Sequence, residues 1–187
     1  MNRVVAVVGM CGSGKSVATD LFVADNWEKV YFGGVTLDTL EERGMEITPD
    51  NERMVREELR EKYGQAAYAV KLLPRIKELL SKGNVVVDGL YSWSEYKYLR
   101  ENLGDVLTIL CIISDRKDRY DRLENRPVRP LSVDEATGRD IAEIENLEKG
   151  GPIAIADHYI VNDGTKEDLE RQVMEYIHSL DESLRNC

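Results

Sequence analysis

Residues 9 to 16 read Gly9-Met10-Cys11-Gly12-Ser13-Gly14-Lys15-Ser16. They match G-x-x-x-x-G-K-[ST], the pattern of the phosphate-binding P-loop. The stretch follows an apolar run at 4–8 and precedes apolar residues at helical spacing, so it has the strand, loop and helix context that the pattern requires. A glycine-rich turn that matches by chance is the alternative, and it is rare at ordinary residue usage. We therefore predict that this loop binds a nucleotide.

The residue types of the loop each suit phosphate binding. Glycines let the backbone curl so that successive N–H groups point into one concavity, and the following helix adds the positive end of its dipole. Lys15 would reach the β and γ phosphates of ATP, and the Ser16 hydroxyl would ligate Mg²⁺. The predicted nucleotide-binding residues are Gly9, Cys11, Gly12, Ser13, Gly14, Lys15 and Ser16.

Composition and charge limit the kinds of molecule that this protein is expected to bind. The chain has 187 residues and a net charge of −10, which gives no general attraction to nucleic acid or to an anionic membrane. The first apolar run is too short for a signal peptide, and no run is long enough to cross a bilayer. Three cysteines without a disulfide pattern suit a reducing compartment. We expect a cytoplasmic monomer or homodimer that acts on a small-molecule phosphate acceptor and binds neither nucleic acid nor membrane.

Apolar runs and helical spacings alternate along the chain. We predict strands at about 3–8, 29–32, 85–87, 106–113 and 158–161. Between them we predict helices at about 15–25, within 36–82, from 92, at 115–125, at 132–150 and from 165. The region 36–82 should break near Gly44 and Gly64, with a kink or break at Pro74. This alternation predicts an α/β fold with a parallel sheet, whose ligands bind at the carboxyl ends of its strands.

Asp88 ends the third predicted strand and is followed by Gly89. An acid in this place can hold Mg²⁺, usually through water, or orient the attacking group. An ordinary Asp-Gly turn is the alternative. Beside a P-loop we favour the metal or base role.

Arginines are concentrated between residues 115 and 140. Arg119, Arg122 and Arg126 have the spacing of one helix face. Interleaved acids allow a merely solvated, salt-bridged helix. We favour an arginine-bearing lid, in which Arg122 and Arg126 clamp the phosphates and stabilise the charge of phosphoryl transfer.

A second arginine set lies on the helix after Pro49. Arg53 and Arg56 would face the phosphate of an acceptor, whereas their interleaved glutamates allow a solvated face as the alternative.

Several stretches in this order resemble the P-loop nucleoside-monophosphate-kinase-like family, with dephospho-CoA kinase and adenylate-kinase-related proteins as the nearest matches. They are the P-loop, Asp88-Gly89, the stretch RLENR at 122–126, RD at 139–140 with Glu143, and ADHYIVNDG at 156–164. The resemblance implies a five-stranded parallel sheet in the order 2-3-1-4-5. It also implies one P-loop kinase-like domain with a helical acceptor-binding insertion at about 35–82 and a lid at about 115–150.

The acceptor side departs from the family pattern. Gly34 and Leu37 stand where adenylate kinases carry an acid and an arginine, and Tyr91 stands where they carry a phosphate-binding arginine. Asp38 is the nearest acid to the position of the dephospho-CoA kinase base. Tyr91 would contact the acceptor or fill the core, and we leave both open.

Together these observations predict a kinase that uses ATP and Mg²⁺. Lys15, Asp88, Arg122 and Arg126 would be catalytic, Ser16 and Asp88 would hold the metal, and the acceptor would meet Asp38, Arg53, Arg56 and Tyr91. A nucleoside monophosphate is the first choice of acceptor and dephospho-CoA the second. A protein that hydrolyses ATP slowly as a switch or assembly factor is the alternative from another class.

Overall fold

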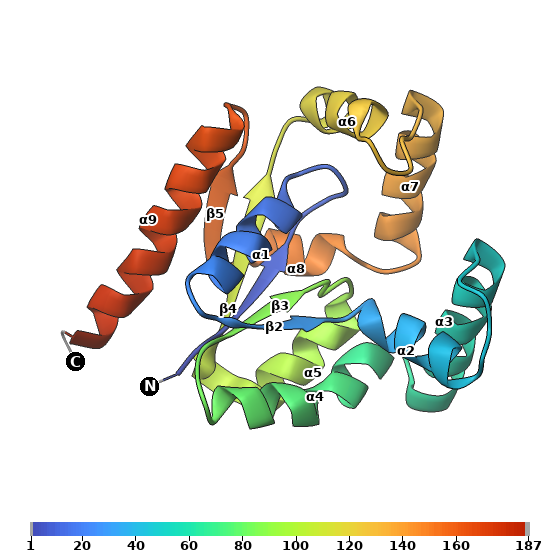
Figure 1. The fold of residues 1–187 in the computed structure, drawn as a ribbon, viewed down its shortest axis with the longest axis horizontal. Coiled ribbons are helices and arrows are strands. Elements are labelled where there is room, and N and C mark those ends of the chain that lie inside the picture. The colour runs from blue at the N-terminus through green and yellow to red at the C-terminus, as the bar shows by residue number, and fades with distance from the viewer. Residues whose placement is uncertain (1, 186–187) are drawn as a thin grey trace.

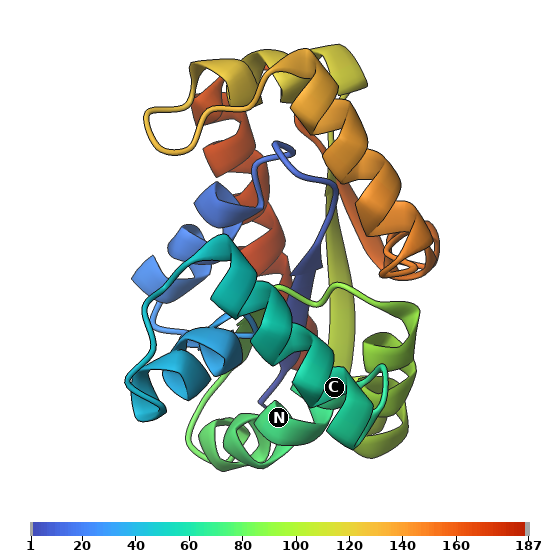
Figure 2. The ribbon, with the colours of Figure 1, turned by 90° about the vertical axis from the view of Figure 1, so that its right-hand side faces the viewer.

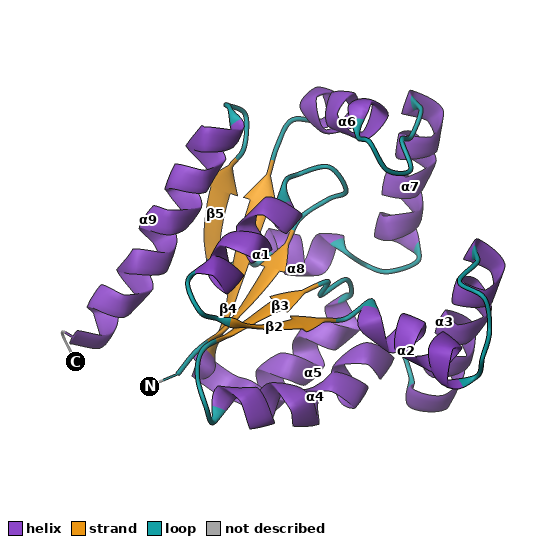
Figure 3. Cartoon of the chain, in the orientation of Figure 1, coloured by secondary structure: helices purple, strands orange, loops and turns teal. Residues whose placement is uncertain are grey.

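A five-stranded parallel sheet forms the centre of the protein, which is described here over residues 2–185 of a computed structural model (Figures 1 and 3). The strands are β1 (Val4–Val8), β2 (Glu28–Tyr31), β3 (Val85–Asp88), β4 (Leu107–Ile113) and β5 (His158–Val161). Their order is β2-β3-β1-β4-β5, and every pairing is parallel. The predicted α/β class and strand order are confirmed.

The apolar sequence of β1 explains why this strand lies at the centre of the sheet, buried on both faces. Its sequence VVAVV has no polar position, and all five of its residues are buried. Helices cover both faces of the sheet, as a strand with two apolar faces requires.

The two faces carry different helices (Figure 1). Helices α1 (Lys15–Ala24) and α9 (Lys166–Arg185) pack on one face, where Phe22 and Ile177 meet Ile112 of the sheet. The other face is covered mainly by α4 (Ala67–Leu80) and α5 (Trp93–Leu103), through residues such as Ile76 and Leu99. Among the described residues, no helix is long and apolar enough to cross a membrane.

The region predicted as broken helix forms three helices, α2 (Gly34–Glu42), α3 (Pro49–Tyr63) and α4. The breaks at Gly44 and Gly64 are confirmed, and both glycines have a positive φ. Of the kink or break expected at Pro74, the break is wrong, because α4 continues through this residue. Proline removes one helical hydrogen bond, while Leu73, Ile76 and Leu79 on the buried face of α4 hold the helix against the sheet.

The arginine-rich region forms α6 (Arg116–Asn125) and α7 (Val133–Glu145) above the sheet edge (Figure 2). Helix α7 begins at a capping box between Ser132 and Glu135, as its sequence predicts. It was expected to continue to Gly150 and instead ends at Glu145. Glu148 has a φ of 52°, which is incompatible with a right-handed helix, and a short helix α8 (Gly150–Ala154) follows.

Two predicted site segments meet at one edge of the sheet. Strands β1 and β3 are neighbours, with Val7 paired to Asp88, so the P-loop and Asp88 leave the sheet side by side. A short 3₁₀ helix at Gly104–Val106 precedes β4 and lies at the opposite edge.

Two adjacent isoleucines of β4 differ in burial, so substituting each of them tests whether the core lies between the sheet and its helices. Ile112 is fully buried and Ile113 is 36% exposed. We expect Ile112→Ala to lower the free energy of unfolding by about 2–5 kcal/mol, because the methyl groups leave a cavity between sheet and helices. Urea denaturation measures this loss, and Ile113→Ala is the matched control, with a much smaller effect. Equal losses at the two positions would contradict the layered core.

Candidate functional site

The P-loop needs its glycines for backbone conformation and for close packing. Gly12 and Gly14 have φ values of 80° and 103°, which L side chains rarely adopt. A Cβ on Gly12 would lie 2.7 Å from the carbonyl oxygen of Arg119, and one on Gly14 would lie 2.5 Å from Nδ2 of Asn162. Helix α6 and the end of β5 therefore press directly on the loop.

Asn162 connects the end of β5 to the P-loop. Its Nδ2 donates to the carbonyl oxygen of Ser13 at 2.8 Å, and the Arg122 guanidinium donates to the Asn162 carbonyl at 3.0 Å. Arg122 also donates to Ser114 Oγ at 3.0 Å. From the sequence alone, Asn162 was only part of a motif at the last strand, because its hydrogen-bond partner lies 149 positions away.

Arg119 has a different place from the one its spacing suggested. Its side chain is buried and donates two hydrogen bonds to Asp140, at 3.0 and 2.6 Å. A further bond of 2.9 Å goes to the carbonyl oxygen of Cys11, and the Tyr120 hydroxyl donates to Asp140 at 3.2 Å. Arg119 thus ties α6 and α7 to the P-loop, instead of facing a ligand together with Arg122 and Arg126.

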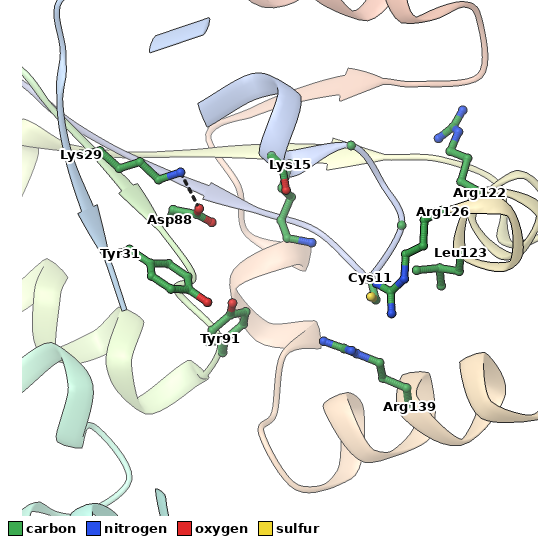
Figure 4. A pocket seen from close by; sticks show the side chains of 13 residues that line it. Cys11, Lys15, Lys29, Tyr31, Asp88, Tyr91, Arg122, Leu123, Arg126 and Arg139 are labelled. Carbon is green, nitrogen blue, oxygen red and sulfur yellow. Dashed lines mark ion pairs between the residues drawn. The ribbon is translucent and has the colours of Figure 1, made fainter. Parts of the chain in front are cut away.

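A cavity of about 590 Å³ lies over the P-loop (Figure 4). Its size suits a small ligand. It is bounded by the P-loop, by β2 and β3, and by the segments α6 and α7. Its lining residues are Cys11, Gly12, Gly14, Lys15, Ser16, Lys29, Tyr31, Asp88, Tyr91, Arg122, Leu123, Arg126 and Arg139.

Lys15 is held inside the loop. Its ammonium donates to the carbonyl oxygen of Met10 at 2.9 Å. Burial, and next the nearby Lys149, lower the pKa of Lys15 to about 8, against smaller raising effects of Cys11, Glu143 and Asp88. A phosphate would supply the negative charge that this ammonium lacks.

Asp88 and Ser16 supply oxygen atoms to the same cavity. The Asp88 carboxylate forms an ion pair with the ammonium of Lys29, with 3.0 Å between Oδ2 and Nζ. The same ammonium lies 3.8 Å from the Asp20 carboxylate. Among the side chains that the structure describes, no group of three or more His, Cys, Asp or Glu residues is arranged to hold a metal ion by itself. The Asp88 carboxylate and the Ser16 hydroxyl are oxygen donors of the kind that Mg²⁺ prefers, and this ion takes few protein ligands and completes its shell with phosphate oxygens and water.

Further arginines border the cavity from α6 and α7. Arg126 is half-buried, and its Nε donates to the carbonyl oxygen of Arg129. Arg139 extends from α7 toward Cys11 and Tyr91 (Figure 4). From the sequence, Arg139 was expected only as one of the basic residues of this region and as part of the family stretch with Asp140 and Glu143, with no role in the site. The signal that could have found it is the stretch that also contains Asp140 and Glu143.

The residues expected on the acceptor side separate into two places. Tyr91 lines the cavity, and burial raises the pKa of its hydroxyl. Asp38, Arg53 and Arg56 are not among the residues that line it. Arg53 pairs with Asp50 at 3.0 Å and Arg56 with Glu52 at 3.3 Å along their own helix.

Comparison with known proteins gives the family. A family model described as an AAA domain (AAA_18) matches residues 5–140. A UPF0200 protein of Thermococcus onnurineus is 34% identical over 181 residues, which cover 95% of this chain and 97% of that one. The chain belongs to the UPF0200 family. Its P-loop and kinase-like fold are shared by proteins of known structure.

Several of these structures are kinases by name. A gluconokinase from Sinorhizobium meliloti superposes with a TM-score of 0.60 at 16% identity, covering 98% of this chain and 95% of that one. The dephospho-CoA kinase from Campylobacter jejuni gives 0.56 at 15% identity, with coverage of 95% and 97%. At these identities the likeness shows the fold, and the resemblance to a P-loop kinase-like family is confirmed at that level.

The buried pair between Arg119 and Asp140 can be tested by removing its cation. We expect Arg119→Met to cost about 3–5 kcal/mol of unfolding free energy, because it leaves the Asp140 charge buried without its partner. Thermal and urea denaturation measure the loss. Lys117→Met on the exposed side of α6 is the control and should be nearly neutral. Equal stability of the two variants would show that the pair does not anchor the P-loop.

The lowered pKa of Lys15 predicts a pH dependence of ATP binding. Near pH 8 half of the free protein has lost the Lys15 charge, so binding above that pH must take up a proton. Affinity for ATP should fall by up to about tenfold between pH 7.5 and 9. Calorimetric titrations at several pH values check this, with Lys15→Met expected to bind weakly and without the trend. Affinity that stays level or rises over this range in the unmodified protein would refute the assignment.

Proposed function

We propose that this protein is an ATP- and Mg²⁺-dependent phosphotransferase that transfers the γ-phosphoryl group to a small nucleotide-like acceptor. The observation that carries the proposal is the convergence of cations on one cavity. Lys15, Arg122, Arg126 and Arg139 all line it, although the chain as a whole has a net charge of −10. Such a local concentration suits a ligand with several phosphates.

The residues of the cavity have separate roles in this reaction. The P-loop amides and Lys15 would hold the β and γ phosphates, and Arg122 and Arg126 would stabilise the transferred group. Ser16 would ligate Mg²⁺, with Asp88 reaching it through water, and the metal would supply charge neutralisation. An acceptor oxygen then bonds to the γ-phosphorus, the bond to the β–γ bridging oxygen breaks, and ADP leaves.

The acceptor would bind beside Tyr91, while Arg139 would face the phosphates of ATP. An aromatic ring at one end of the cavity suits a base, so a nucleoside monophosphate is the first choice. Dephospho-CoA is the alternative. It is favoured by the structural likeness to the Campylobacter jejuni enzyme and by Asp88, whose carboxylate could accept the proton of a hydroxyl acceptor.

A second candidate is a switch or assembly protein that hydrolyses ATP slowly. The specific observation in its favour is the ion pair between Lys29 and Asp88. The ammonium of Lys29 is paired with the Asp88 carboxylate, which a metal ion or an acceptor would otherwise contact. In a kinase this pair must open or rearrange when ligands bind.

A panel of acceptors separates the two candidates. We expect ADP release from Mg-ATP to rise strongly with one nucleotide-like acceptor, and the phosphorylated acceptor to appear in equal amount. Asp88→Asn should lower this turnover by about 10²-fold or more, with a smaller change in ATP affinity, because it removes the charge and keeps the size. Asp20→Asn is the matched control, since Asp20 also neighbours Lys29 but does not line the cavity.

Slow ADP release that no acceptor changes would refute the kinase and support the switch. Equal activity of the Asp88→Asn variant and its control would show that Asp88 has no catalytic role and serves only as a turn residue.

A further inference from the structure

Glu143 is a buried carboxylate shared by two cations. It lies near the end of α7 and is 7% exposed. One of its oxygens accepts a hydrogen bond from Nε of Arg139 at 3.2 Å, and the other accepts one from the ammonium of Lys149 at 2.6 Å. Both oxygens of this single carboxylate are therefore engaged, each by a cation from a different part of the chain.

Lys149 reaches toward the loop after β3. Its side chain is almost completely buried, and its ammonium lies 5.1 Å from the centre of the Tyr91 ring, within the range of a cation–π contact. The Lys149 amide also donates to the Glu143 carbonyl at 3.2 Å. Two residues on, Gly151 packs against Trp93 so closely that a Cβ would lie 2.8 Å from its ring. This segment is thus fixed on the acceptor end of the cavity.

Arg139 reaches in the other direction, into the cavity (Figure 4). The contact with Glu143 uses Nε and holds the stem of the side chain. Among the residues whose side chains the structure describes, 2–180, none accepts a hydrogen bond from the two terminal nitrogens of Arg139, so the forked end is available to a ligand. A guanidinium fork fixed in this way suits two oxygens of one phosphate group.

We propose that Glu143 is a positioning residue, which aims Arg139 at the phosphates and holds Lys149 against Tyr91, so that the two ends of the cavity are ordered together. This inference rests on the ATP-binding part of the proposed function. Glu143 itself does not line the cavity, so it acts on the ligand only through its two partners. The charge balance supports this role, because without Glu143 two neighbouring cations would repel each other and Lys149 would be buried unpaired.

A double-mutant cycle on ATP binding tests the inference. Arg139→Met should weaken ATP binding by about tenfold or more, which is the value of one charge-assisted contact. Glu143→Gln should weaken it by a similar factor, since it releases the guanidinium. The double variant should bind no more weakly than Arg139→Met alone, because both changes remove the same contact. Glu145→Gln, an exposed neighbour on α7, is the matched control and should bind normally.

A further variant covers the case in which Glu143→Gln fails to fold. Glu143→Gln combined with Lys149→Met removes both buried charges and leaves Arg139 without its anchor. It should fold, as circular dichroism will show, and bind ATP as weakly as Arg139→Met. Normal ATP binding by this folded variant would overturn the inference.

The outcomes distinguish this inference from the function on which it rests. Multiplicative losses in a chain that binds ATP would show that Glu143 is merely structural and would leave the kinase proposal intact. If ATP binds with the expected coupling but no acceptor is phosphorylated, the kinase proposal is refuted and the positioning role of Glu143 stands. Failure of the unmodified chain to bind ATP would overturn both.

Discussion

The position of β1 between β3 and β4 is the constraint on which the rest of the structure depends. A strand of five apolar residues must be buried on both faces, so helices have to cover it on both sides. Its two neighbours then bring their carboxyl ends to the same edge. The P-loop and Asp88 meet there because Val7 pairs with Asp88, and the cavity forms above them.

The site concentrates positive charge in an acidic protein, and buried contacts make this possible. Burial lowers the pKa of Lys15, while Arg122 is held by Ser114 and by the Asn162 carbonyl. Arg139 and Lys149 share Glu143. Protein contacts orient these cations, and a site oriented in this way needs little reorganisation to bind a ligand with several phosphates.

Two buried acids of α7 form ion pairs with different cations and so stabilise different parts of the site. Asp140 pairs with Arg119 and fixes the position of α6 and α7 on the P-loop, whereas Glu143 pairs with Arg139 and Lys149 and connects α7 to the loop that contains Tyr91. They lie three positions apart on one helix and so face in similar directions. A single helix thereby contacts both ends of the cavity.

The α/β class, the P-loop, the approximate strands and the capped helix starts could all be predicted from the sequence, because they depend on local patterns of apolar residues, glycines and capping side chains. The sequence also placed Asp88 at the strand end. The roles of most individual side chains in the site could not be predicted, because they depend on contacts that form only in the folded protein. The spacing of Arg119, Arg122 and Arg126 could not show that Arg119 turns inward to Asp140, and the glutamates around Arg53 and Arg56 could not show which arginines line a cavity. The site roles of Asn162, Arg139, Glu143 and Lys149 depend on partners supplied by the fold, and Pro74 stays within a helix because the sheet beneath it holds the helix in place. Local signals cannot specify a contact whose energy comes from residues distant in the chain.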